Sequence, residues 1–486
     1  MLLGINEIVS IGLEVAYVVS IPFALMIIFQ NRSPSKTLAY LLLFFALPIV
    51  GILIYYVFGE NYRKKKLYKR KFTRDQASFE RYTNYLAKLS EHLIRNHAEQ
   101  LQGSEQLIRL VLKDTGLPLS INNEVDLLLN GEEKFTAMFE AIEQARHHIH
   151  MEYYIFDKGL IAKRLKDILL KKSKEGVSIR IIYDDFGTDL GFSTLRELRK
   201  SGIEILPFYR IWFPIVSNRH NYRDHRKIII VDGKVAFTGG INISDRYDNS
   251  IKTNKLYWRD THLKISGEAV KQLQYLFFIN WNFCADAELP VTQDYFPDVP
   301  HVHNNQLVQL IHSGPDSDRA SIMMSYFAAI TLARDYVYIT TPYFIPNESL
   351  LTALKTAALG KVDVRLLVPD QSDSRLVNAA SQSYYSELLE AGVKIYLYQK
   401  GFVHAKTMVA DHCLSIVGSA NMDIRSFDLN FELNATVYDE KVHQQLREAF
   451  ERDIADSVEI TLPEWEERSR MKKMGESFCR LISAIL

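Results

Sequence analysis

The chain contains the octapeptide HRKIIIVD at residues 225–232 and a second one, HAKTMVAD, at residues 404–411. Both have the form His-x-Lys-x4-Asp, and both are followed at the same offset by an asparagine, Asn242 in the first copy and Asn421 in the second. One such pattern can arise by chance. Two copies with matching downstream residues indicate an internal repeat.

Each copy also predicts the same local structure. The apolar run after each histidine is typical of a buried strand that ends in a turn, and a second apolar run follows at once. We therefore expect a hairpin in each half, with the histidine and the lysine on one strand. Alternate residues of a strand point to the same face, so His225 should point with Lys227, and His404 with Lys406, into a cavity.

Strands and helices alternate around both motifs. Strand-like runs separated by helical patterns begin in the first half near Val125, Ile149, Val177 and Gly202, and in the second near Leu307, Val337, Val362 and Gly392. This alternation predicts an α/β fold in each half, with a largely parallel sheet, helices on both faces and the motif hairpin antiparallel to part of the sheet. A pseudo-two-fold axis between the halves would bring both His–Lys pairs to one cleft.

The N-terminus opens with two apolar runs, residues 8–29 and 37–58. Each is about 20 residues long, enough for a helix to cross about 30 Å of hydrocarbon, so together they predict a transmembrane hairpin. Basic residues crowd positions 63–71 after the second run, whereas the link between the runs has only Arg32 and Lys36. This asymmetry predicts a cytoplasmic body. The same cluster would suit anionic lipid headgroups, and a purely topogenic role is the alternative.

The remaining segments follow from composition shifts. We divide the chain into the transmembrane hairpin (1–60), a basic and helical connector (61–117), a first motif-bearing domain (118–295), a second one (296–460) and an amphipathic C-terminal helix (461–486). The tail has an apolar stripe with basic residues largely off it, which suits a membrane interface. Docking of this helix on the protein body is the alternative.

The composition gives no support for a nucleic-acid-binding, disulfide-bonded or metal-binding protein. Formal net charge is +0, so the average gives no reason to expect nucleic acid or an acidic partner. The three cysteines, Cys284, Cys413 and Cys479, match no metal-binding spacing and indicate a reduced protein without disulfides. No carboxylate cluster suggests a metal, and we expect no metal and no cofactor.

With both motifs in place, the sequence resembles the phospholipase D superfamily, whose signature is two His-x-Lys-x4-Asp motifs, and within it bacterial cardiolipin synthases. Supporting stretches are NYRDHRK at 221–227, TPYFIP at 341–346 and GSANMD at 418–423. The resemblance covers nearly the whole chain and implies two phospholipase D-like α/β domains behind a membrane hairpin. It places the protein in the bacterial inner membrane as a multi-pass protein, with its catalytic domains on the cytoplasmic side.

The resemblance also implies a reaction: phosphatidyl transfer from one phosphatidylglycerol to another, giving cardiolipin and glycerol through a phosphohistidine. Partners would be phosphatidylglycerol and an anionic lipid surface, without nucleic acid, and oligomeric state stays open. The motifs do not separate this transferase from a hydrolytic phospholipase D. A nucleic acid phosphodiesterase is disfavoured by the membrane segments and zero net charge. A non-catalytic scaffold is disfavoured by two complete motifs.

A phosphodiester is an anion, so attack on it needs positive charge and a proton donor. Lys227 and Lys406 can hold its non-bridging oxygens, and the phosphate-binding group is completed by Asn242, Asn421, Gly240 and Ser419. Two imidazoles can divide nucleophilic attack and proton transfer. The residues leave the order open, and the resemblance implies His225 as nucleophile and His404 as acid and base.

Each histidine needs a partner at its second nitrogen. In the family a carboxylate orients the histidine, and we assign Glu432 to His404 and Asp260 to His225, each within its own half. Asp232 and Asp411 complete the catalytic signature, but their place at a strand end suggests a structural hydrogen-bonding role.

Other residues near the motifs have two readings each. The aromatic segment 208–216 is either a lipid-facing lip or core, and His220 is a weak candidate for headgroup contact. Glu152, Tyr153, Tyr343 and Phe344 end equivalent strands, where they either line the cleft or pack.

Overall fold

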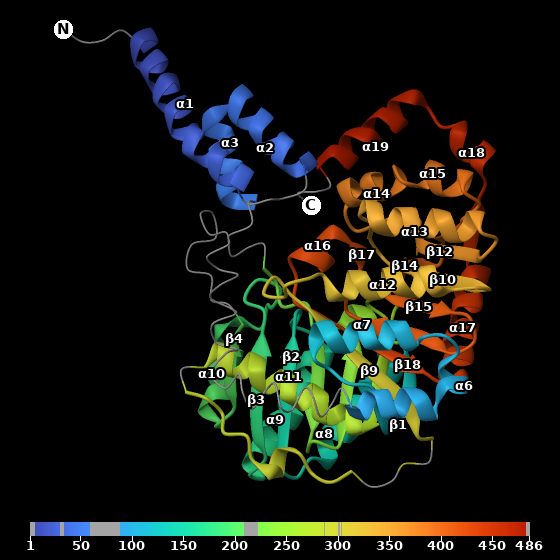
Figure 1. Ribbon diagram of the computed structural model, residues 1–486. Helices are drawn as coiled ribbons and strands as arrows, with labels where there is room; N and C mark the ends of the chain where they lie inside the picture. Colours follow the sequence, from blue (N-terminus) through green and yellow to red (C-terminus); the bar gives the residue numbers. More distant parts are fainter. Residues whose placement is uncertain are drawn as a thin grey trace. The chain divides into compact units, whose positions relative to one another are not determined.

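The computed structural model describes residues 5–29, 34–58, 88–208, 222–285, 287–299, 302 and 304–482 (Figure 1). The N-terminal helices form one compact unit and the body forms a second. Three sequence predictions lie outside the described residues: the basic cluster 63–71, most of the aromatic segment 208–216, and His220.

The described part of the N-terminal unit consists of three helices: α1 (Ile5–Phe29), α2 (Pro34–Ala46) and α3 (Pro48–Phe58). The second apolar run, expected as one helix, divides at Leu47, because Pro48 lacks a backbone N–H and its ring crowds the preceding turn. Ile27, Phe44 and Tyr55 form a small core, and most other apolar side chains described in this unit are exposed. Within the described ranges, no helix combines the length and hydrophobicity that a membrane crossing requires.

A single 15-stranded sheet forms the centre of the body. Its order is β19-β13-β12-β10-β15-β16-β18-β9-β1-β8-β6-β5-β2-β3-β4, so the halves mirror each other about the β9–β1 pair. The first half supplies β1 (Ser120–Leu129), β2 (His148–Tyr153), β3 (Ser178–Tyr183), β4 (Glu204–Pro207), β5 (Lys227–Val231), β6 (Val235–Gly239) and β8 (Thr261–Gly267). The second supplies β9 (Gln306–Ser313), β10 (Tyr336–Thr340), β12 (Asp363–Pro369), β13 (Lys394–Tyr398), β15 (Thr407–Ala410), β16 (Leu414–Gly418), β18 (Glu432–Tyr438) and β19 (Ser457–Ile460).

The prediction of a largely parallel sheet is wrong. Within the 15-stranded sheet, only β2-β3-β4 and β10-β12-β13 are parallel, and every other neighbouring pair is antiparallel. The motif hairpins β5–β6 and β15–β16 are the cause: strands joined by a tight turn must run antiparallel, and each hairpin sits inside the sheet rather than at its edge. The expected antiparallel placement of the hairpins is confirmed.

Helices cover both faces of the sheet, as predicted (Figure 1). In the first half they are α8 (Asn130–Gln144), α9 (Leu160–Lys174), α10 (Gly191–Lys200) and α11 (Glu268–Cys284). In the second they are α12 (Ser321–Leu332), α13 (Glu348–Leu359), α14 (Arg375–Gln382), α15 (Tyr385–Glu390), α16 (Ile424–Asp428) and α17 (Glu440–Ala455). One apolar cluster lies in each half, and a third, which includes Phe277 of α11 and Leu446 of α17, joins residues of both. The two halves therefore share a core.

The connector belongs to the second half. Its helices α6 (Ala98–Leu101) and α7 (Glu105–Thr115) place Leu107 and Ile108 in that half's core. The amide of Gln309 donates to the backbone oxygens of Ile108 at 3.1 Å and Leu117 at 3.2 Å. The helical character was predicted, whereas its packing partner was not.

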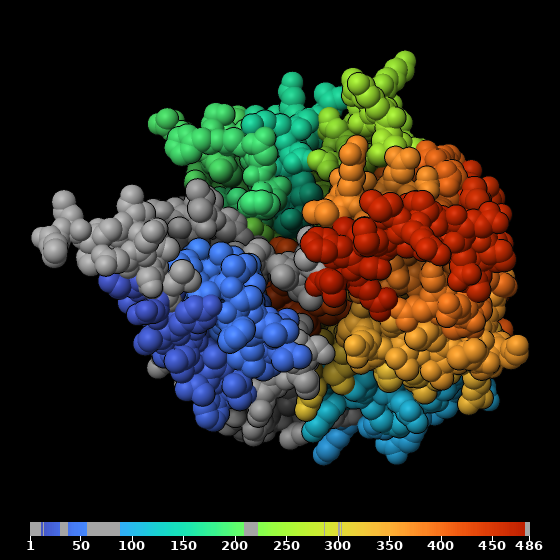
Figure 2. Space-filling model, turned by 90° about the horizontal axis from the view of Figure 1, so that it is seen from above, coloured from blue at the N-terminus to red at the C-terminus, as the bar shows by residue number. Residues whose placement is uncertain are grey.

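The tail forms α18 (Leu462–Glu466) and α19 (Arg470–Ile482), and α19 lies on the surface of the body (Figure 2). Its inner face buries Cys479 and Glu476, and Arg468 pairs with Glu476 at 2.6 Å. The outer face exposes four large apolar side chains, Met471, Met474, Phe478 and Leu481. One face thus docks on the body while the apolar stripe stays free.

Candidate active site

The two motif histidines stand just before their strands rather than in them. His225 precedes β5, which begins at Lys227, and His404 lies between β14 (Gly401–Val403) and β15. The backbone of each histidine is held by the other half: the His225 N–H donates to the oxygen of Phe431 at 2.9 Å, and the His404 N–H to that of Arg259 at 2.7 Å.

These contacts belong to two short parallel pairings between the halves. In one, β14 of the second half pairs with β7 (Tyr257–Arg259) of the first. In the other, Asp224 bridges to Phe431. The segments after these pairings continue directly into Asp260 and Glu432, so each carboxylate is delivered to the opposite half.

The assignment of each carboxylate to the histidine of its own half is therefore wrong. Nδ1 of His225 lies 2.9 Å from both oxygens of Glu432, and Nδ1 of His404 lies 2.7 Å from Oδ2 of Asp260. The residues are those predicted, but the pairing is exchanged. A carboxylate only accepts hydrogen bonds, so Nδ1 of each imidazole donates and Nε2 is left to face the cleft.

Gly240 and Ser419, predicted to bind phosphate, lie behind the carboxylates instead. The hydroxyl of Ser419 donates to Oε2 of Glu432 at 2.5 Å. A Cβ on Gly240 would stand 2.1 Å from Oδ1 of Asp260, so glycine makes room for that side chain. Both positions act on the partner of a histidine, and neither lines the cleft.

The two lysines are buried beside their own histidines. Nζ of Lys227 donates to the backbone oxygen of His225 at 2.5 Å, and Nζ of Lys406 donates to that of His404 and lies 2.9 Å from Nδ1 of the same ring. Burial lowers the pKa of Lys227 to about 7 and that of Lys406 to about 8. Their charge is therefore sensitive to whatever enters the cleft.

Burial also sets the charge of the imidazoles. It lowers the pKa of His225 to about 4 although Glu432 opposes it, and it lowers the pKa of His404 well below the ordinary value, with Lys406 and Lys227 adding to the effect. Both rings are thus neutral near pH 7 when the cleft is empty. A neutral His225 has a free lone pair on Nε2, as a nucleophile requires.

The two carboxylates differ in charge state. Burial raises the pKa of Asp260 to about 6, although Lys406 opposes the shift. For Glu432 burial also acts upward, but the contacts to His225, Lys227 and Ser419 outweigh it, and the pKa is lowered. Glu432 is therefore firmly ionised at neutral pH, whereas Asp260 is close to titration.

The histidines open into a cleft of about 300 Å3 that both halves line. Asn242 and Asn421 lie in its wall, as predicted, and Nδ2 of Asn242 donates to the hydroxyl of Tyr247 at 2.8 Å. Further lining residues are Tyr154, Arg223, Arg246, Tyr247 and Trp258 from the first half and Tyr343, Asp373, Asp423, Arg425 and Asn430 from the second.

Asp232 and Asp411 lie at the far end of the motif hairpins and do not line the cleft, so the structural hydrogen-bonding role predicted for them is confirmed and their place in the catalytic group is not. The carboxylate of Asp232 accepts from the backbone N–H groups of Arg146, His147 and His148 at 2.8, 2.8 and 2.9 Å. Asp411 does the same for residues 334–336. Each ties its hairpin turn to the start of a neighbouring strand.

Several cleft residues were not singled out from the sequence. Arg246 and Arg425 carried a usable signal, because each stands four residues after the asparagine of its half. Tyr343 lines the cleft, whereas Phe344 and Tyr153 are buried in the core. Glu152 is also buried, where its carboxylate accepts from Arg226 at 3.2 Å.

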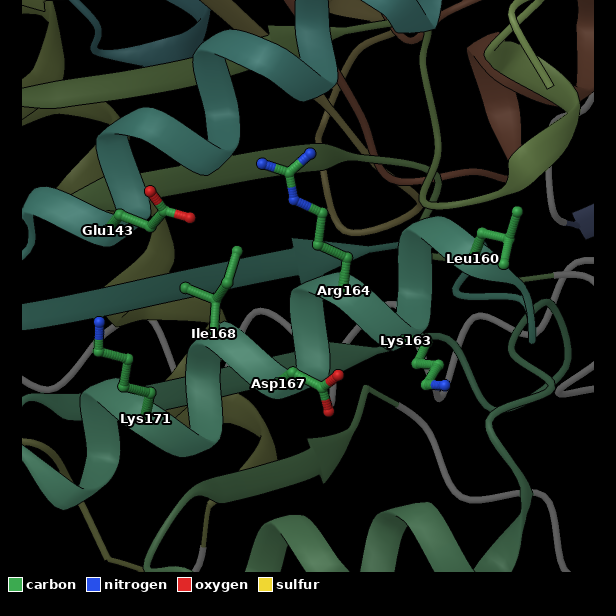
Figure 3. A pocket seen from close by; sticks show the side chains of 7 residues that line it. All are labelled: Glu143, Leu160, Lys163, Arg164, Asp167, Ile168 and Lys171. Carbon is green, nitrogen blue, oxygen red and sulfur yellow. The ribbon is translucent and has the colours of Figure 1, made fainter.

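A second depression runs along α9 and includes Glu143 of α8 (Figure 3). Its side chains come from the outer faces of two neighbouring helices, and none of the motif residues lines it. Among the described residues, no group of histidine, cysteine and acidic side chains is arranged to hold a metal ion.

The chain is similar to proteins of known family over most of its length. The chain matches the family described as "Cardiolipin synthase, PLD-like domain" over residues 138–277 and 326–454, and "Phospholipase_D-nuclease N-terminal" over residues 18–60. It is 42% identical to "Cardiolipin synthase 2" of Bacillus anthracis over 464 residues, which is 95% of this chain and 89% of the relative. It is 40% identical to "Cardiolipin synthase" of Geobacillus sp. (strain WCH70), over 98% of this chain and 94% of the relative.

Among solved structures, the phosphatidylserine synthase of Haemophilus influenzae Rd KW20 superimposes with a TM-score of 0.59. The match covers 78% of this chain and 100% of that chain, at 15% identity. At that identity the likeness establishes the fold alone.

Proposed function

Because this chain belongs to the cardiolipin synthase family of phospholipase D-like proteins, we propose that it joins two phosphatidylglycerols into cardiolipin and free glycerol. The observation that carries the proposal is the pair of imidazoles in one cleft, each with Nδ1 on a buried carboxylate and each beside a buried lysine. This arrangement supplies two nitrogens for two tasks at one phosphodiester.

The first half of the reaction would break the donor lipid. Nε2 of His225 attacks the phosphorus, the bond from phosphorus to the glycerol oxygen breaks, and that oxygen takes a proton from protonated His404. The products are free glycerol and a phosphatidyl group on His225. Lys227 and Lys406 hold the non-bridging oxygens, with Asn242 and Asn421 as additional donors.

The second half would use the same groups in reverse. A hydroxyl of the second phosphatidylglycerol gives its proton to neutral His404 while its oxygen attacks phosphorus, and the bond between phosphorus and His225 breaks. Cardiolipin leaves, His225 is restored, and His404 regains the proton that it donated earlier. The cycle therefore consumes no proton overall.

Substrate binding would prepare the acid. In the empty cleft the positive charge of Lys406 and Lys227 helps to lower the pKa of His404. A phosphodiester anion between these lysines offsets their charge, which raises the pKa of the imidazole and favours the protonated form. The same anion would keep Lys227 and Lys406 charged.

We further propose that the enzyme works at a membrane, as a multi-pass protein of the bacterial inner membrane with its domains on the cytoplasmic side. Supporting features are the exposed apolar side chains of α1 to α3 and the apolar stripe of α19, which Arg470, Lys472 and Lys473 flank. An exposed apolar face bordered by basic residues suits an anionic lipid surface. The five-segment division and a role without nucleic acid belong to the same proposal.

Product analysis tests the function. Purified protein is added to phosphatidylglycerol vesicles with a chelator and without added metal, and cardiolipin, glycerol and phosphatidic acid are measured by mass spectrometry. Cardiolipin and glycerol in equal amounts support transfer. Phosphatidic acid as the main product would make this a hydrolytic phospholipase D, and activity on DNA alone would overturn the lipid assignment.

A further inference from the structure

Arginines bring positive charge to the wall of the cleft, in addition to the two lysines that are buried beside the histidines. Arg246 and Arg425 occupy equivalent places, four residues after Asn242 and Asn421, and both line the cleft. They act on different ends of it. Burial, the two lysines and His225 dominate the lowered pKa of His404, and Arg246 adds to it. Arg425 instead acts on the pKa of Tyr154, whose ring lies 4.8 Å from that of His225.

The guanidinium of Arg246 is oriented but not used up. Nη2 donates to Asp157 at 3.0 Å, Nε donates to Ser244 at 3.2 Å, and the group lies 5.4 Å from the ring centre of Trp258. Nη1 has no hydrogen-bond partner among the described residues, and the side chain is 45% exposed. A planar fork held in this way suits the oxygens of a phosphate.

The wall around His404 is aromatic. Trp258 lies 5.5 Å from the imidazole and packs against Tyr247 at 5.1 Å and Phe402 at 4.9 Å. The equivalent position beside His225, two residues before the carboxylate, is Asn430. The His404 side therefore offers an indole surface for the carbons of a glycerol unit, whereas the aromatic ring beside His225 is the phenol of Tyr154.

A hydroxyl partner lies on the same side. The hydroxyl of Tyr343 donates to Oδ2 of Asp373 at 2.8 Å. The negative charge of Asp373 acts to raise the pKa of Lys406. The carboxylate of Asp373 can accept from a glycerol hydroxyl that does not react. Guanidinium, aromatic surface and carboxylate together match a glycerol that carries a phosphate.

Reaction geometry explains why the acceptor needs this side. In an in-line displacement the entering oxygen approaches phosphorus opposite the group that leaves, so the acceptor hydroxyl must lie away from His225 and next to His404. The acceptor phosphatidylglycerol carries its own phosphodiester at the other end of the glycerol. We infer that Arg246, with Trp258 and Asp373, forms an acceptor subsite that binds the phosphate and glycerol of the second lipid. This inference rests on the proposed function.

Charge makes Arg246 selective among acceptors. Lys227 and Lys406 serve the phosphate under attack, so a second anion in the same cleft would meet repulsion without a cation of its own. Free glycerol and water carry no charge and need no such partner. Arg246 should therefore favour a phosphate-bearing acceptor over glycerol, while it has little effect on cleavage of the donor.

The test compares two soluble acceptors in one tube. Phosphatidylglycerol vesicles serve as donor, and isotopically labelled glycerol competes with glycerophosphoglycerol, the deacylated headgroup that carries a phosphodiester. Mass spectrometry separates labelled phosphatidylglycerol from the glycerophosphoglycerol adduct and from cardiolipin. For Arg246→Gln we expect the ratio of phosphate-bearing products to labelled phosphatidylglycerol to fall about tenfold or more, as for loss of a charged hydrogen bond.

Arg425→Gln is the matched control, because it makes the same change at the equivalent position near His225. It should alter all products alike and leave the ratio within about twofold. Arg246→Lys keeps the charge but not the fork, so its ratio should fall between those of wild type and Arg246→Gln; it also decides the case if Arg246→Gln proves inactive.

The outcomes separate the two proposals. An unchanged ratio in Arg246→Gln, or in Arg246→Lys where only that variant is active, overturns the acceptor subsite while the transferase assignment stands. An equal fall in Arg425→Gln also overturns it, because the effect would then be general. Wild-type protein that makes neither cardiolipin nor labelled phosphatidylglycerol would instead overturn the proposed function itself.

Discussion

The two halves of the body carry the same motif but surround it differently. Glu432 beside His225 accepts hydrogen bonds from Ser419 at 2.5 Å and from Asn430 at 3.2 Å. Asp260 beside His404 accepts from the backbone N–H of Thr261 at 2.7 Å and packs against Gly240.

The two copies of the motif can therefore have different roles, because their carboxylates differ in charge state. The pKa of Glu432 is lowered whereas that of Asp260 is raised to about 6. A firmly ionised carboxylate makes its imidazole a better nucleophile, and a weaker partner makes the other imidazole a better acid. This asymmetry supports His225 as nucleophile and His404 as acid and base.

The largest effect should come from the histidines themselves. His225→Ala and His404→Ala should each lower cardiolipin formation by about 10^3-fold or more, because each removes a whole step. A donor with a p-nitrophenol leaving group separates them, since nitrophenolate departs without a proton. His404→Ala should still release nitrophenolate in one burst, measured by absorbance, and His225→Ala should release none.

An exposed histidine provides the control for this pair. His412 lies on the surface and pairs with Asp335 at 3.1 Å, so His412→Ala should match wild type in both assays. Burst release by His225→Ala and none by His404→Ala would reverse the two roles.

Substitution of each carboxylate by its amide should have the next largest effect. Glu432→Gln should lower turnover by about 10^2- to 10^4-fold because its amide favours the wrong imidazole tautomer, by analogy with triad carboxylates. The loss should be of the His225 type, without nitrophenolate release. In Asp260→Asn the turnover should fall less, by about 10^2-fold, and the burst of nitrophenolate should remain.

This comparison tests the pairing across the halves directly. If Glu432→Gln keeps the burst while Asp260→Asn loses it, each carboxylate serves the histidine of its own half.

A pH–rate profile adds a check. The kcat/KM of wild type should fall below about pH 6 as Asp260 is protonated, and this fall should be absent from Asp260→Asn.

The sequence was sufficient for the α/β class and for bringing the two motif histidines to one cleft, because both depend on local patterns. Apolar runs after the histidines placed β5 and β15, and the chemistry of an anionic substrate selected His225, His404 and their lysines. The partner of each histidine was not predictable, because it depends on how β7 and β14 pair between halves. Spacing along the chain carries no information about that pairing.

The strand directions and the contacts of individual side chains were also not predictable from spacing along the chain. Parallel strands were overestimated because the strand-helix alternation does not reveal that a hairpin is inserted within the sheet. The position of Ser419 after the second motif suggested a hydrogen-bond donor to the substrate phosphate, yet its hydroxyl donates to Glu432. Arg246 was overlooked although its repeat with Arg425 is visible in the sequence.

The residues behind the carboxylates should show intermediate effects. Gly240→Ala should cost more than Ser419→Ala, because a Cβ at 2.1 Å from Asp260 forces that side chain to move, whereas Ser419→Ala removes one hydrogen bond. For Ser419→Ala we expect about a tenfold loss, the effect of one charged hydrogen bond. Without that donor the pKa of Glu432 rises. As the pH is lowered, the variant should therefore lose activity at a higher pH than wild type does. A kcat/KM profile checks the shift, and an unmoved profile would contradict the contact.

The smallest effect on catalysis should come from the aspartates that end the two motifs, Asp232 and Asp411, whose substitution should affect the stability of the two halves to different degrees. Asp232 accepts three short backbone hydrogen bonds, at 2.8 to 2.9 Å, whereas those to Asp411 measure 2.9 to 3.2 Å. Both residues have positive φ, 54° and 50°, a conformation that asparagine also tolerates. Asp232→Asn should therefore lower the free energy of unfolding by about 1–3 kcal/mol, Asp411→Asn by less, and denaturant melts measure both. Turnover per folded molecule should stay within about twofold. A loss as deep as that of the histidine variants, in protein shown to be folded, would return these carboxylates to the reaction itself.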